Sequence, residues 1–316
     1  MYVIYDEEMN SKIAALLLAA AVVLAACGSA KSIPVRTGPV PDARNIEASA
    51  CADPTTAIEI IDTVLSRFQA ELSAYTDIEA VYICEDLFSI GVKVPAASTR
   101  VNGKTVIYVD AGASRKVGVS FTHELFHALE FSNPVDEDAW ARINPYETYP
   151  FETASPGEII RYNPNMIPAF EPGFVTDYAR FSAMEDRAEL FTILYSDREL
   201  SAKERAALLS DPFLMEKVAF LKEYLSAIGF DIDDNLLSVE TNYSCRSYKL
   251  LDPELVLTGP SGVYPKANVK AGQLLADSGF ESDGIKMLYD EDLQRVYAPL
   301  SALEPLDTTV LFAFPR

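Results

Sequence analysis

The 316-residue sequence is poor in basic residues, cysteine and histidine. Its 26 Lys and Arg stand against 47 Asp and Glu, which leaves a formal net charge of -21. Nucleic acids and anionic lipid surfaces are bound through clusters of basic side chains, so this balance argues against both as charge-driven partners. Four cysteines are too few for a disulfide scaffold. A hydrophobic fraction of 49% indicates a globular chain, long enough for two domains.

The sequence also lacks an apolar run long enough to cross a bilayer as a helix, which takes about 20 residues. The apolar run over residues 13–26 has 14 residues and follows a short basic start at Met9 and Lys12. Such a run is typical of a secretion signal. We interpret residues 1–26 as a signal peptide. Residues 1–8 are then an extension before the true start at Met9, because the acidic residues 6–8 do not fit a basic signal start.

The signal ends in Leu-Ala-Ala-Cys at residues 24–27, followed by Gly28 and Ser29. Small residues before a cysteine resemble the lipobox of bacterial lipoproteins. The resemblance implies acylation of Cys27 and a mature chain anchored by its lipid to the outer side of the cell membrane. The alternative is an ordinary signal peptide with a chance cysteine. The small polar composition and three prolines of residues 28–52 predict that residues 27–52 form a lipidated, flexible tether.

Hydrophobic periodicity beyond the tether predicts an α+β fold, with one domain over residues 53–240 and a small all-β domain over residues 248–316. Residues 132–177 carry seven of the nineteen prolines and predict a long loop with little regular structure. The main predicted strands of the first domain are 78–84 and 105–110, and its predicted helices after the first are 117–131, 183–195 and 203–228.

Lipidation of Cys27 would leave three thiols, an odd number that cannot all pair within one chain. Cys84 lies in an apolar run, which favours a small core residue. A bridge between Cys51 and Cys84 stays open on the sequence alone, and Cys245 would then be unpaired.

The two histidines of the chain stand four residues apart, at His123 and His127, with Glu124 beside the first. On a helix, positions i and i+4 lie on one face, so both imidazoles can reach one metal ion. This H-E-x-x-H pattern is that of zinc peptidases, in which the glutamate meets a water on the metal. The sequence therefore predicts a Zn²⁺ site at His123 and His127, with Glu124 as the general base.

Catalytic zinc needs a third protein ligand and an open position for water. A metzincin would have Gly and His where this chain has Glu130 and Asn133, so the third ligand must be a carboxylate. Glu185 is the best candidate, with Glu189 one helical turn later as an acceptor for the hydrogen bond of a ligating histidine. The alternatives left open for the third ligand are Glu189 itself, Glu147, Glu152, Glu158 and Asp136.

H-E-x-x-H with a downstream Glu-Asp-x-Ala-Glu helix resembles the gluzincins and, more narrowly, bacterial zinc-binding metallopeptidase lipoproteins. Tyr178, seven residues before Glu185, is placed similarly to a tyrosine in the catalytic domain of anthrax lethal factor. The resemblance covers roughly residues 55–230. It implies that Tyr178 faces the substrate carbonyl. It also implies that residues 105–110 form the edge strand of the zinc cleft, where a peptide could add as a further strand.

The C-terminal segments around residues 257–261, 269–274, 285–287 and 295–300 resemble a bacterial SH3-like barrel. Such domains bind cell-wall peptides or serve as spacers, so a wall peptide is a candidate partner. The chain departs from the pattern at Gly284 and Ile285, where many of these domains carry an aromatic residue, which puts ligand binding in doubt.

These features predict a membrane-anchored, extracytoplasmic zinc metallopeptidase acting on a peptide or protein substrate. Glu124 would take a proton from the zinc-bound water and deliver it to the leaving amine, and Tyr178 would stabilise the oxyanion. One alternative is a non-catalytic surface lipoprotein with a structural zinc site, acting through its β domain. Another is a zinc-holding or zinc-delivery lipoprotein. Glu124 favours the enzyme, because a structural site needs no general base.

Overall fold

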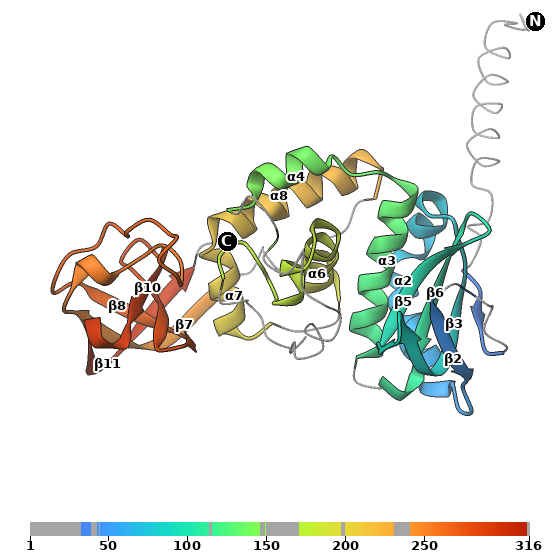
Figure 1. The fold of residues 1–316 in the computed structure, drawn as a ribbon, viewed down its shortest axis with the longest axis horizontal. Helices are drawn as coiled ribbons and strands as arrows, with labels where there is room; N and C mark the ends of the chain where they lie inside the picture. The colour runs from blue at the N-terminus through green and yellow to red at the C-terminus, as the bar shows by residue number, and fades with distance from the viewer. Residues whose placement is uncertain are drawn as a thin grey trace, which may run out of the picture.

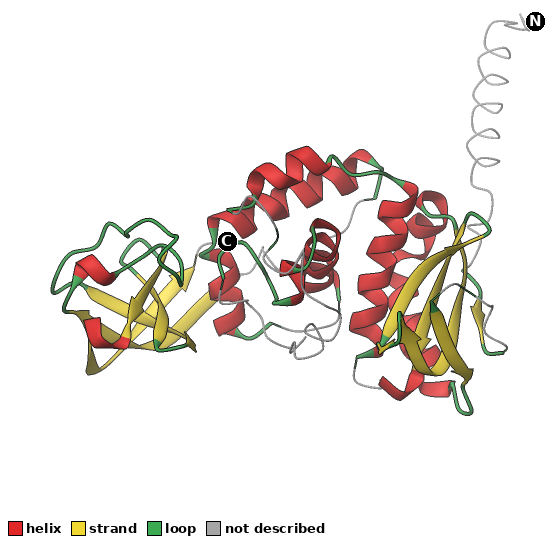
Figure 2. Cartoon of the chain, viewed as in Figure 1, coloured by secondary structure: helices red, strands yellow, loops and turns green. Residues whose placement is uncertain are grey.

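The computed structural model describes residues 33–38, 43, 45–113, 116–145, 149, 171–196, 200–230 and 241–314. The predicted signal peptide and Cys27 lie outside these residues. The described part has an α+β architecture with two sheets (Figures 1 and 2). None of its helices combines the length and the apolar character needed to cross a membrane.

The N-terminal sheet is built around β3 (Ile78–Ser89). Its strand path runs β1 (Val35–Arg36), β3, β6 (Lys104–Asp110), β5 (Ala96–Val101), while β2 (Ile46–Ala50) and β4 (Val92–Lys93) pair with β3 off this path. β3 is parallel to β1 and β6. Both faces of β3 and β6 are buried, which explains their near-continuous apolar runs.

One face of this sheet packs against α2 (Thr55–Tyr75) and α3 (Val117–Ser132). Val81 and Ile107 on the strands join Leu65 of α2 and Phe121 of α3 in a single core cluster. α3 lies between this sheet and α6 (Ala183–Tyr195). One side of α3 packs against the sheet, and the other side faces α6 (Figure 1). The short η1 (Ala111–Ala113) connects β6 toward α3.

The segment predicted as a tether contributes strands to this sheet. β1 pairs with β3 in parallel, and β2 pairs with it antiparallel from Ile46 to Ala50. Within the described residues, the folded domain therefore includes part of the range 27–52. Both strands are short and contain polar residues, so their alternation of apolar and polar residues is too weak to predict them from the sequence.

The expectation that residues 105–110 form an edge strand is wrong. β6 is hydrogen-bonded on both sides, to β3 and to β5, and the strand path ends at β5. β5 and β6 form a hairpin whose turn residues Asn102 and Gly103 both have positive φ, 50° and 79°. That turn matches the right-handed twist of the two strands. The weakly apolar sequence Ala-Ala-Ser-Thr-Arg-Val concealed β5.

The predicted loop 132–177 contains a helix, α4 (Glu137–Ile143). The Asp136 side chain accepts a hydrogen bond from the backbone N–H of Ala139 at 2.9 Å and so caps its start. The short η2 (Tyr178–Arg180) follows the predicted loop, and much of the range between α4 and η2 lies outside the described residues.

The predicted helix 203–228 is two helices, α7 (Ala202–Leu209) and α8 (Pro212–Ala227). The break falls at Asp211, whose side chain accepts hydrogen bonds from the backbone N–H groups of Phe213 and Leu214. Pro212 at the first helical position of α8 has no N–H to donate to the preceding turn. α8 lies beside α4 (Figure 1).

The C-terminal part is all-β apart from η3 (Pro253–Leu255) and η4 (Leu300–Ala302) in the described residues. Its antiparallel sheet has the order β10, β9, β8, β7, β11. No pairing joins the end strands β10 and β11 in the described chain, so a closed SH3-like barrel is not shown, and that finer assignment stays a prediction. The strand bounds are β7 (Thr241–Leu250), β8 (Leu274–Ser282), β9 (Ile285–Tyr289), β10 (Arg295–Pro299) and β11 (Leu303–Phe314).

The three described cysteines, Cys51, Cys84 and Cys245, are free thiols. The Cys51 thiol donates a hydrogen bond to Glu85 at 3.3 Å. Cys84 is buried in an apolar cluster on the N-terminal sheet. The Cys51–Cys84 bridge that the sequence left open is therefore not formed in this structure.

Candidate metal centre

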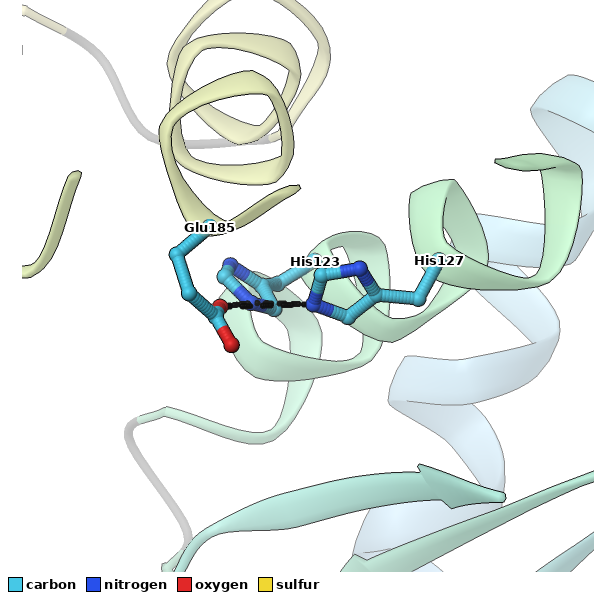
Figure 3. Close-up of side chains that lie close together, drawn as sticks. All are labelled: His123, His127 and Glu185. Carbon is cyan, nitrogen blue, oxygen red and sulfur yellow. Dashed lines mark hydrogen bonds and ion pairs between the residues drawn. The ribbon is translucent and has the colours of Figure 1, made fainter. Parts of the chain in front are cut away.

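The two histidines and Glu185 meet between α3 and α6 (Figure 3). His123 Nε2 lies 2.9 Å from Glu185 Oε2 and 3.0 Å from His127 Nε2, and His127 Nε2 lies 3.3 Å from the same carboxylate oxygen. All three side chains are largely buried. Within the described residues, no other group of three His, Cys, Asp or Glu side chains converges in this way.

These distances fit a single small cation. Three ligand atoms that each lie about 2.1 Å from a tetrahedral ion are about 3.4 Å from one another. The observed separations of 2.9 to 3.3 Å approach that value. Two imidazole nitrogens and one carboxylate oxygen are also a donor set that zinc accepts. The residues present therefore fit a bound Zn²⁺.

Glu185 reaches the histidines because α6 begins just before it. The Ser182 hydroxyl accepts the backbone N–H of Glu185 at 3.2 Å, which caps the helix and places Glu185 in its first turn. Further along, the rings of Phe126 on α3 and Phe191 on α6 pack with centroids 4.9 Å apart. The capped start and this apolar contact together hold the two metal-facing helix surfaces against each other.

The second nitrogen of each histidine also faces a carboxylate. His123 Nδ1 lies 2.9 Å from Glu189 Oε1, and the other oxygen of Glu189 accepts the Thr176 hydroxyl at 2.7 Å. His127 Nδ1 lies 3.6 Å from Glu130 Oε2, an ion-pair separation. At His123 the contact is of hydrogen-bond length, so it favours a proton on Nδ1 and leaves Nε2 as an acceptor.

The role of Glu130 and its partners was not predicted from the sequence. Arg187 on α6 forms a buried charge-assisted hydrogen bond to Glu130, and it binds Glu137 of α4 at 2.7 and 2.9 Å. This arginine links three helices around His127. The spacing of Glu130, three residues after His127 on the same helix, is a signal that could have indicated it.

The carboxylates raise the pKa values of both imidazoles. Burial by itself lowers the pKa of His123, but hydrogen bonds to Glu185 and Glu189 raise it well above its usual value. Burial opposes the rise at His127 as well, yet the charge of Glu185 and contacts with Glu130 and Glu185 bring that pKa to about 9. Burial raises the pKa of Glu185, whereas the two imidazoles lower it well below its usual range. The surroundings thus favour positive charge at the convergence point.

Glu124 and Tyr178 lie beside this cluster. Glu124 is buried on α3 next to His123. The Tyr178 ring, in η2, lies 5.9 Å from the His123 ring between centroids. Burial, followed by the charges of Glu185, Glu124 and Glu189, raises the pKa of the Tyr178 hydroxyl well above its usual value. The hydroxyl therefore stays protonated near neutral pH and can donate a hydrogen bond.

Among the other candidates for the third ligand, the structure describes Asp136 and shows it away from the cluster. The carboxylate of Asp136 caps α4 and is not part of the convergent group. Glu147, Glu152 and Glu158 lie outside the described residues.

No family model matches the chain, and no curated protein matches it. Among solved structures, the chain shows a similarity to a proposed zinc-binding metallo-peptidase from Bacteroides caccae, with a TM-score of 0.43 and 14% sequence identity, over 73% of this chain and 90% of that one. This similarity is too weak to assign a function. The functional assignment therefore rests on the geometry around His123, His127 and Glu185.

Proposed function

We propose that this protein is a zinc-dependent metallopeptidase of the gluzincin type, with His123, His127 and Glu185 as its protein ligands. The convergence of these three donor atoms within 4.8 Å carries the proposal. A purely structural zinc site has four protein ligands, whereas a catalytic one has three and an open position. The described residues bring three such atoms together, and Glu124 lies next to them.

A bound Zn²⁺ supplies Lewis acidity that polarises a carbonyl and lowers the pKa of a water molecule. Glu124 is the group placed to accept the proton of the attacking water and then to pass it to the leaving amine. Tyr178 keeps its proton and can donate a hydrogen bond to the oxygen that becomes negative in the transition state. Glu124 is buried, and the exclusion of water from its side chain strengthens its interactions.

The carboxylates behind the histidines orient the rings for this chemistry. Glu189 is held by Thr176 and faces His123 Nδ1, and Glu130 is held by Arg187 and faces His127 Nδ1. The hydrogen bond to Glu189 favours a proton on His123 Nδ1 and leaves its Nε2 free to act as a metal ligand, while the charge of Glu130 lies on the Nδ1 side of His127.

A peptide substrate would bind along the outer strand β5, and not along β6, which is paired on both sides. β5 ends the strand path of the N-terminal sheet and contacts α3, the helix that carries both histidines. An extended peptide could pair with this strand through backbone hydrogen bonds and so lie along the metal centre. Main-chain pairing of this kind is compatible with peptide or protein substrates of many sequences.

The direct test is metal content together with activity. The purified protein should contain about one Zn²⁺ per chain and should cleave members of a broad peptide library. Dialysis against a chelator should abolish cleavage, and added Zn²⁺ should restore it. Bound zinc with no cleavage across the library would favour a non-catalytic surface lipoprotein instead.

Replacement of Glu189 by alanine should weaken zinc affinity without removing the site. The substitution takes away the acceptor of His123 Nδ1 but leaves all three donor atoms, and losses of this kind cost roughly 10- to 100-fold in metal affinity. Competition with a chromophoric chelator measures the change. An unchanged affinity would mean that His123 is oriented by other groups.

We also propose that Cys27 is acylated and anchors the protein to the outer side of the cell membrane. Residues 24–29 support this, since they have the small residues, cysteine and Gly-Ser of a lipobox. Cys27→Ala should move the protein from the membrane fraction to the soluble fraction of cells. A membrane-bound Cys27→Ala protein, with no acyl mass on wild-type Cys27, would contradict the lipobox interpretation.

A further inference from the structure

The C-terminal sheet packs tightly against α7. Ala206 and Ala207 of α7 share a buried apolar cluster with Met287 and Tyr289 of β9. At the rim, the Lys203 ammonium donates to the Gly279 carbonyl at 2.6 Å and lies 3.7 Å from the centroid of the Phe280 ring. The interface is therefore a packed core with a polar edge, and it fixes the sheet against the helical region.

Arg295 of β10 crosses this interface. Its guanidinium forms a buried ion pair with Asp211, the residue that caps α8. The same carboxylate oxygen, Asp211 Oδ2, accepts the backbone N–H of Gly173 at 2.8 Å. One end of the segment that leads to η2 and α6 is thus tied to the C-terminal sheet through one carboxylate.

A second buried pair continues from Gly173 to the metal centre. The Lys217 ammonium donates to the Gly173 carbonyl and to Asp186 Oδ2, both at 2.6 Å. Asp186 is fully buried and also accepts hydrogen bonds from Trp140 and Tyr149. Asp186 directly follows Glu185 in the first turn of α6, so its buried contacts hold the turn that carries Glu185.

A further contact reaches the same segment from the C-terminal part. The Tyr264 hydroxyl donates to Glu171 Oε2 at 3.1 Å. The other oxygen of Glu171 lies 3.8 Å from a guanidinium nitrogen of Arg180. Arg180 belongs to η2, which also carries Tyr178. Both routes therefore end beside residues of the candidate metal centre.

We propose that Arg295 is a positioning residue of the metal centre, acting through Asp211, Gly173, Lys217 and Asp186 on Glu185. The role of Arg295 rests on the metal site of the proposed function, but it does not require peptidase activity. The four charges alternate in sign along the chain of contacts, and each is almost fully buried. A buried charge that loses its partner is strongly unfavourable, so a change at one end shifts the groups that follow.

The test compares two buried cations of the same sheet. Arg295→Met removes the pairing with Asp211, while Lys286→Met on β9 removes a similarly buried cation that pairs with Asp277 inside the sheet. Co²⁺ affinity and the visible spectrum of the Co²⁺ form are measured for folded protein. Arg295→Met should weaken Co²⁺ binding about fivefold and alter the spectrum. Lys286→Met should keep both at their wild-type values.

A folded Arg295→Met protein with the wild-type affinity and spectrum would overturn this proposal alone. Equal effects of the two substitutions would also overturn it, since general loosening of the sheet would then be the cause. A wild-type protein that binds neither Co²⁺ nor Zn²⁺ would reject the metal centre and this proposal together.

A reciprocal experiment needs no substitution, and it tests the role of Arg295 even if the Arg295→Met protein does not fold. Coupling between two sites acts equally in both directions. Metal binding to the wild-type chain should therefore slow amide hydrogen exchange at Gly173 and in β10, relative to β11. Exchange at Gly173 and in β10 that is the same with and without metal would overturn the proposal.

Discussion

Replacement of Glu124 by glutamine should leave metal binding intact and remove nearly all peptide cleavage. Glutamine keeps the volume and polarity of the buried side chain but cannot accept the proton of the attacking water. Groups that transfer protons in this way contribute about 10²- to 10⁴-fold to the rate. The measurement is kcat/KM on a peptide found in the library screen, with zinc content determined on the same sample.

Two companion variants sharpen this result. Glu216→Gln makes the same chemical change on the exposed surface of α8 and should behave as wild type. Tyr178→Phe should lose less activity than Glu124→Gln, because the metal still supports the developing negative charge. Cleavage by Glu124→Gln at the wild-type rate would assign the activity to another site.

Replacement of Glu185 by alanine should remove most of the bound zinc at limiting metal concentration. The substitution deletes one of three donor atoms and leaves two imidazoles to hold the ion. It also removes the largest of the contributions that raise the pKa of His127, so that pKa should fall in the variant. Zinc content after gel filtration measures the loss.

The control for this substitution is Glu223→Ala, which removes an exposed carboxylate from α8 and should retain full zinc content. Full occupancy in Glu185→Ala would place the third ligand elsewhere. The remaining acidic residues of the range 132–177 would then be the next to substitute.

Several local features could be predicted from the sequence, because the interactions that produce them lie within a few residues. His123 and His127 share a helix face through their spacing alone. The Asn102-Gly103 turn needs only residues that tolerate positive φ. The break between α7 and α8 was missed although Asp211 and Pro212 are local signals, because the apolar spacing continues across them.

Other features depend on which elements pack together, and a local pattern does not contain that information. The weakly apolar β5 is the outer strand only because β6 pairs with both β3 and β5. Arg187 supports Glu130 only because α6 lies against α3 and α4. In so acidic a chain, no pattern shows which carboxylate meets which cation.

The sequence by itself determined the chemistry of the candidate site: two imidazoles one helical turn apart, with Glu124 beside them. It also ranked Glu185 first among the acidic residues, on the strength of a short helical motif. Only the tertiary structure decided that Glu185 meets both Nε2 atoms and that Arg295 is connected to it through buried charges. The physical reason is separation along the chain: Arg295 and Asp211 are 84 residues apart, and only the packing of the C-terminal sheet on α7 brings them together.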